Sequence, residues 1–317
     1  MGRKVVITSF LDEEVNPAAA RIGVKINPAA VQAMLGQKDL WQACKAFRVR
    51  TTVSSAGYVP NLAVGGLFSQ GTFAPERLRE LAGLKGQLAK VFDLFVQNTP
   101  RSFLLGGMDF EVASEPQEPK VWLFGKPCSA GKASQEWGLP RAIVNVLEIN
   151  EKFGLHGFTA MAFDARGIVP TCNIYQFEDT PWLRDAESRQ KYLAAHGLRA
   201  SEAYARLRID VIGAYQTLAM SDREADQRLV RVCLGHPTSL ELPVGPDFDV
   251  MRKFHQGGGR GIDGITFGPG IADYLKGENS VGMFELLMGH LFRSNTAGAV
   301  SSFLKLQARN FWKRMRK

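Results

Sequence analysis

Residues 157–177, GFTAMAFDARGIVPTCNIYQF, contain the clearest β pattern of the chain. Two apolar segments, 157–163 and 168–177, flank the connection Asp164-Ala165-Arg166-Gly167. Aspartate and glycine between apolar segments are typical of a turn that joins two antiparallel strands. This stretch therefore predicts a β-hairpin.

The two sides of the hairpin differ in their patterns. On the N-terminal side, short apolar segments typical of strands, such as 3–10 and 21–26, alternate irregularly with helical patterns. On the C-terminal side, apolar residues recur mainly at helical spacing, as in 201–220, 247–255 and 281–292.

These patterns together predict an α+β fold. It would have a mixed strand and helix N-terminal half, with the β-hairpin near 157–177, and a mainly helical C-terminal half. The corresponding domains are an α+β core domain, residues 1–178, and a mainly helical region, residues 179–317, that ends in a basic amphipathic helix.

Composition excludes several classes of protein. Of the 317 residues, 45% are hydrophobic, which is enough for a buried core and excludes a disordered or fibrous chain. We expect no membrane-spanning helix, because no apolar segment is long enough, and a cytoplasmic location, because the first residues do not read as a secretory signal. The four cysteines and five histidines show no metal-binding or redox spacing, so neither a metal nor a cofactor is predicted.

The positive charge of the chain is concentrated near its C-terminus. The net charge is +8, and no acidic residue follows Glu285. The segment 297–317 predicts an amphipathic helix with basic residues beside its apolar stripe. Such a helix could dock on its own protein, bind nucleic acid, or lie on an anionic membrane. Its candidate nucleic-acid contacts are Lys305, Arg309, Lys313, Arg314, Arg316 and Lys317.

A glycine-rich segment follows the candidate helix at 247–255. It matches the dinucleotide-binding pattern GxGxxG at 259–264, but the preceding residues indicate a helix where that motif needs a strand. Consecutive glycines can still direct backbone N–H groups at a phosphate, and the alternative is a plain connector. The candidate phosphate-contacting residues are Gly257, Gly258, Gly259 and Gly261, with the basic residues Arg252, Lys253 and Arg260 beside them.

A second basic loop is predicted after the strand at 120–124. It resembles a P-loop, but five residues separate its glycines, Gly125 and Gly131, and Ala133 replaces the required Ser or Thr. This spacing argues against a nucleotide triphosphatase and leaves Lys126 and Lys132 as candidate anion contacts. No catalytic motif is recognised elsewhere, so no catalytic residue is predicted and enzymatic activity is left open.

Charge and glycine loops together favour one function over two others. The favoured function is a non-catalytic nucleic-acid-binding protein that recognises the backbone or shape of RNA or single-stranded DNA. It would be a subunit of a nucleoprotein assembly, such as a mobile-element, phage or guide-RNA complex. The alternatives are an enzyme that binds a phosphorylated small molecule or nucleotide through its glycine-rich basic loops, and a structural assembly subunit whose basic end docks on an acidic protein.

Overall fold

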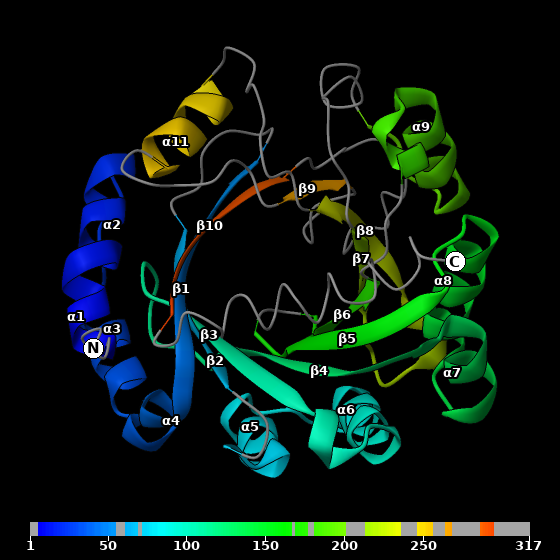
Figure 1. Cartoon of the computed structure of the whole chain (residues 1–317), viewed down its shortest axis with the longest axis horizontal. Helices are drawn as coiled ribbons and strands as arrows, with labels where there is room; N and C mark the ends of the chain where they lie inside the picture. The colour runs from blue at the N-terminus through cyan, green and yellow to red at the C-terminus, as the bar shows by residue number, and fades with distance from the viewer. Residues whose placement is uncertain are drawn as a thin grey trace, which may run out of the picture.

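The computed structural model describes residues 6–54, 61–68, 72–166, 169–176, 181–200, 213–235, 246–255, 264–267 and 286–294. Within them, ten antiparallel strands form a closed barrel in the order β1-β10-β9-β8-β7-β6-β5-β4-β3-β2, in which β2 pairs again with β1 (Figure 1). The strands are β1 (Cys44–Ser54), β2 (Leu62–Phe68), β3 (Leu105–Glu111), β4 (Lys120–Ser129), β5 (Gly157–Asp164), β6 (Thr171–Gln176), β7 (Gly213–Ala219), β8 (Arg228–Gly235), β9 (Gly264–Phe267) and β10 (Leu286–Ser294).

Helices surround the outside of this barrel (Figure 1). They are α1 (Ile7–Phe10), α2 (Asn16–Ile22), α3 (Pro28–Leu35), α4 (Lys38–Ala43), α5 (Pro75–Leu81), α6 (Gly86–Asn98), α7 (Ala130–Glu136), α8 (Arg141–Lys152), α9 (Ala186–Ala195) and α11 (Pro246–His255). A π-helical stretch joins α1 to α2, and short 3-10 turns occur at Arg101–Phe103, Pro181–Arg184 and Glu224–Asp226. Among the helices that the structure describes, none is both long and apolar enough to cross a membrane.

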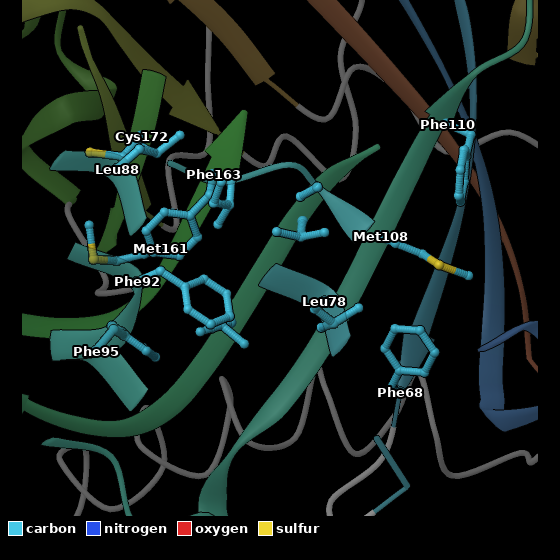
Figure 2. Close-up of a cluster of buried hydrophobic side chains, with 14 of the residues drawn as sticks. Phe68, Leu78, Leu88, Phe92, Phe95, Met108, Phe110, Met161, Phe163 and Cys172 are labelled. Atoms are coloured by element: carbon cyan, nitrogen blue, oxygen red, sulfur yellow. The ribbon is translucent and has the colours of Figure 1, made fainter. Parts of the chain in front are cut away.

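The hydrophobic core lies between the outer face of the strands and the helices. Figure 2 shows Phe92 and Phe95 of α6 beside Met161 and Phe163 of β5, and the rings of Phe92 and Phe163 are 5.1 Å apart. These side chains are almost completely buried. Because side chains alternate between the two faces of a strand, the apolar outward residues place their neighbours, such as Asp164, on the inner face. Asp164 therefore lies inside the barrel, while its apolar neighbour Phe163 packs against α6.

A buried polar network attaches α8 and α9 to the barrel. Asn150 of α8 accepts hydrogen bonds at Oδ1 from the Tyr192 hydroxyl at 2.8 Å and from His196 Nε2 at 2.9 Å. Tyr192 accepts a hydrogen bond from Gln216 of β7, and Asn150 donates to Gln176 of β6. Asn150, Gln176, Tyr192 and Gln216 are fully buried, so these bonds hold two helices to two strands.

The predicted fold class is wrong for the C-terminal half. An α+β fold with a mainly helical C-terminal half does not match a chain whose residues after 178 supply β7 to β10 of the closed sheet. The predicted helix at 201–220 overlaps β7, and the one at 281–292 overlaps β10. A strand covered on both faces lacks a simple alternation of apolar and polar residues, so its pattern resembles that of a buried helix. In β7, outward Leu218 and inward Thr217 are both buried.

Two N-terminal strand predictions also fail. In the described part of 3–10, Ile7–Phe10 forms α1, and Arg21 and Ile22 complete α2. Short apolar segments cannot distinguish a strand from one face of a helix. The predicted hairpin is present, since β5 and β6 pair antiparallel with Phe163 opposite Cys172.

Gly66 of β2 provides a test of the packing outside the barrel. A Cβ atom there would overlap Cys44 Sγ and lie 2.9 Å from the Trp41 ring, and both neighbours are buried. We expect Gly66→Ala to lower the free energy of unfolding by about 1–3 kcal/mol, measured by urea denaturation. Adding Cys44→Ala should restore part of this loss, because it removes the overlapping sulfur. A Gly66→Ala protein as stable as the wild type would contradict this packing.

Candidate functional site

The inner face of the barrel carries a cluster of charged side chains. Strand register aligns Arg48 of β1, Gly65 of β2, Asp109 of β3 and Lys120 of β4 across the sheet. All four face inward, because the residue next to each of them on its strand packs outward in the hydrophobic core. With their neighbours they form what we call the inner charged cluster: Arg48, Arg50, Asp109, Glu111, Lys120, Asp164 and Arg166.

Asp109 is the centre of one half of this cluster. Its Oδ2 accepts hydrogen bonds from Arg48 Nη2 and Arg50 Nε, both at 3.1 Å. Arg50 also donates through Nη2 to Glu111 Oε1 at 2.9 Å. The Asp109 side chain is 0% exposed, whereas those of Arg48 and Arg50 are 11% and 13% exposed. The carboxylate is thus enclosed, while the guanidinium groups keep some accessible surface.

Gly65 makes these ion pairs geometrically feasible. It lies on β2 between Arg48 on β1 and Asp109 on β3. A Cβ atom at this position would stand 2.7 Å from Asp109 Oδ1 and 2.8 Å from Arg48 Nε. The two side chains therefore meet across β2 only because residue 65 has no side chain.

Arg166 is the centre of the other half. It donates from Nε to Asp164 Oδ1 at 2.8 Å and from Nη2 to Asp164 Oδ2 at 2.6 Å, and its Nη1 lies 3.4 Å from Glu111 Oε1. Burial by itself would raise the pKa of Asp164, but these hydrogen bonds and the charges of Arg166 and Lys120 outweigh burial and lower the pKa. Asp164 therefore stays ionised at neutral pH.

The cluster has more positive than negative groups. Burial lowers the pKa of Lys120 to about 8, and the charges of Arg50 and Arg166 act in the same direction, so its ammonium is still mostly protonated at neutral pH. Arg231 of β8 also faces inward, since it pairs with Thr217 and its neighbour Val232 packs outward. Arg228 of β8 lies in the same row as Asp164, through Thr171 and Ala219, and so also faces inward. Among the described inward charges, six are basic and three are acidic, a surplus of three positive charges.

Aromatic side chains continue the inner face next to the charges. The Arg48 guanidinium carbon lies 3.7 Å from the centre of the Trp122 ring, a cation–π contact. Trp122 Nε1 donates to the Tyr175 hydroxyl at 3.3 Å, and the Tyr175 and Tyr215 rings are 4.8 Å apart. Both tyrosines are half-buried, and Trp122 is buried.

A pocket opens at the same end of the barrel as the charged cluster. Its volume is about 740 Å³, and it is lined by three connections of the chain, which contribute Lys85, Ala165 and Asp222 among others. Ala165 stands between Asp164 and Arg166 in sequence, so the pocket adjoins the charged cluster. Asp222 accepts a hydrogen bond from the backbone N–H of Gln87 at 2.7 Å, which fixes one wall to α6.

The four predicted basic residues that the structure describes do not form one cluster. Lys126 is exposed on β4, and Lys132 on α7 forms an exposed ion pair with Glu136 at 3.6 Å. Arg252 on α11 pairs with Asp249, and Lys253 is exposed beside it. Figure 1 shows α7 and α11 on opposite sides of the barrel. The remaining predicted residues lie outside the described part of the chain: Gly257, Gly258, Gly259, Arg260, Gly261, Lys305, Arg309, Lys313, Arg314, Arg316 and Lys317.

Sequence reasoning missed the inner charged cluster, although a signal for it exists. In Arg48-Val49-Arg50 and in Asp109-Phe110-Glu111, charged residues alternate with apolar ones at the period of a strand. Such alternation usually indicates a strand with one face in solvent. Only closure of the sheet turns that polar face into an interior.

Two comparisons of the sequence identify no relative. No protein-family model matches the chain, and a search of the curated proteins found no similar sequence. In the part of the chain that the structure describes, no group of three or more His, Cys, Asp or Glu residues is placed to hold a metal ion. The inner carboxylates Asp109 and Asp164 contact guanidinium groups.

Proposed function

We propose that this protein binds single-stranded nucleic acid, RNA or single-stranded DNA, without catalysing a reaction on it. The observation that carries the proposal is the surplus of basic groups on the inner face of a closed sheet. Arginine dominates this set, and its planar guanidinium matches the geometry of phosphate oxygens better than any other side chain. The half-buried Tyr175 and Tyr215 add ring surface of the kind on which bases stack.

The size of the barrel supports a single strand. Eight-stranded barrels have interiors that side chains or one small ligand fill, and channels appear only near sixteen strands. A ten-stranded barrel is closer in size to the eight-stranded barrels than to the porins. Its interior therefore suits one end of a single-stranded nucleic acid and is too narrow for a duplex. The contacts are to phosphate groups, so recognition of the backbone is expected rather than of base sequence.

We propose no reaction because two inner carboxylates are engaged by guanidinium groups and are poorly placed to accept a proton. Asp109 and Asp164 are each held by guanidinium hydrogen bonds, and the low pKa of Asp164 makes it a poor proton acceptor. We further propose that the protein acts in the cytoplasm as a subunit of a nucleoprotein assembly. The C-terminal cations from Lys305 to Lys317 would extend the contact along the strand.

Binding of short single-stranded oligonucleotides, followed by fluorescence anisotropy across a salt series, tests the proposal. If five of the inner cations meet phosphates, the logarithm of the association constant should fall with the logarithm of salt concentration with a slope of about −3.5. Lys120→Gln should weaken binding severalfold and reduce the steepness of that slope by about 0.7. Duplexes should bind more weakly than single strands.

The matched control is Lys90→Gln, which removes the same charge from an exposed position on α6, outside the barrel. It should leave the affinity and the slope close to those of the wild type. Salt-independent binding, or equal behaviour of the two lysine variants, would exclude the inner face as the binding surface.

A further inference from the structure

The inner face changes from charged to aromatic side chains along the axis of the barrel. This order indicates the kind of ligand that the face could hold. We propose that the charged cluster and the tyrosine pair together bind one nucleoside phosphate unit, with its phosphate at the charged cluster and its base at Tyr175 and Tyr215. This assignment rests on the proposed function and makes it more specific. The unit can belong to a free nucleotide or to the phosphorylated end of a strand, and the experiment separates these two sources.

Strand register defines successive rows of inward side chains. The charged row contains Asp109 opposite Lys120. Two residues further along β4, Trp122 lies opposite Gly107 and Ala162. Two residues beyond that, Tyr175 and Tyr215 lie opposite each other in a row that also contains Ala160. Each step of two residues advances about 7 Å along the strand, so the backbone of the tyrosine pair lies about 14 Å beyond the charged row. Side chains bridge this distance, because Trp122 contacts both the Arg48 guanidinium and the Tyr175 hydroxyl.

The charged end of the inner face fits a phosphate group. Arg50 and Arg166 retain exposed surface, 13% and 11% of their side chains, although both contact carboxylates. They converge on Glu111, which lies 2.9 Å from Arg50 and 3.4 Å from Arg166. A phosphate placed beside them would gain charge-assisted hydrogen bonds from guanidinium N–H groups that already point into the barrel.

The aromatic end fits a base. The Tyr175 and Tyr215 rings are tilted by 35° at 4.8 Å, and both residues are half-buried on the inner face. The adjacent inward positions of β5, Ala160 and Ala162, have small side chains. Stacking on a ring tolerates any base, which agrees with recognition that does not depend on sequence.

Isothermal titration with adenosine 5′-monophosphate, ribose 5-phosphate and adenosine tests this arrangement. The nucleotide should bind at least tenfold more tightly than either of its parts. Tyr215→Leu should reduce nucleotide affinity by about tenfold and leave the affinity for ribose 5-phosphate unchanged, because it removes only the stacking contact. Lys120→Gln should weaken both phosphorylated ligands equally, and Tyr215→Phe, which keeps the ring, should retain nucleotide binding.

Melting curves of all variants, with Lys90→Gln as the control, establish first that they are folded. If oligonucleotides bind with the expected salt dependence but the nucleotide neither binds nor competes with them, the nucleoside phosphate site is wrong while the proposed function stands. If neither binds, both fail. A Tyr215→Leu protein with unchanged nucleotide affinity also overturns the site. Where the nucleotide binds, tighter binding of an oligonucleotide with a terminal phosphate assigns the site to a strand end, and equal binding assigns it to the free nucleotide.

Discussion

Replacing Asp109 by asparagine is expected to lower the free energy of unfolding by about 3–5 kcal/mol at neutral pH. The Asp109 carboxylate is fully buried and is the shared acceptor of Arg48 and Arg50. An asparagine can accept a hydrogen bond from one guanidinium, but its amide N–H groups then face the other. Arg48 and Arg50 would both lose this carboxylate, and Arg50 would keep only its ion pair with Glu111. Leaving largely enclosed charges with less neutralisation is among the costliest changes in a protein.

Urea denaturation of the wild type and of Asp109→Asn measures this loss. The matched control is Asp93→Asn on α6, which removes a carboxylate that pairs with Arg79 at 3.5 Å, with both side chains about 40% exposed. An exposed pair contributes less than about 1 kcal/mol, so the control should unfold almost like the wild type. Equal losses in the two variants would mean that the inner cluster does not depend on its central carboxylate.

Acidification from pH 7 to pH 5 is expected to cost about 2 kcal/mol through His196 alone. Burial lowers the pKa of this imidazole from 6.5 to about 4. Its Nε2–H donates to Asn150, and within the described residues its buried Nδ1 has no hydrogen-bond partner that could share a proton. The unfolded chain therefore takes up a proton near pH 6.5, whereas the folded protein does so only near pH 4. The unfolded state binds more protons in this window, so stability falls as the pH falls through it.

His196→Gln isolates this contribution, since glutamine can still donate to Asn150 but does not titrate. The melting temperature of the variant should fall less between pH 7 and pH 5 than that of the wild type. Asp164, whose pKa is lowered, adds its own loss only at more acidic pH, and the variant retains it. Parallel pH profiles of the two proteins would show that folding does not lower the pKa of His196.

Local sequence patterns predict part of this fold for clear physical reasons. The hairpin formed by β5 and β6 has its turn residues between two apolar segments, and its strands are adjacent in sequence. The helix α11 has apolar residues at helical spacing, which predict it at 247–255. The helix satisfies its backbone hydrogen bonds within itself, and the two hairpin strands pair with each other across a short connection, so nearby residues carry the information.

The candidate site could not be predicted in the same way. Arg48 and Asp109 are far apart in sequence, and they meet only because β1, β2 and β3 pair side by side and Gly65 leaves room between them. Local patterns favour basic residues that are close to one another in sequence. Lys132 belongs to α7 and Arg252 to α11. Figure 1 shows these two helices on opposite sides of the barrel, and they pack against different strands.

The sequence by itself determined which segments are apolar enough to be buried, where the central hairpin turns, and that the chain as a whole is basic. The tertiary structure decided which face of each strand is enclosed. A strand pattern is the same whether its polar face meets solvent or the inside of a closed sheet, because alternation records only that the two faces differ. The pairing of β1 with β10 closes the sheet, and that contact between the two ends of the fold turns alternating charges into an interior cluster.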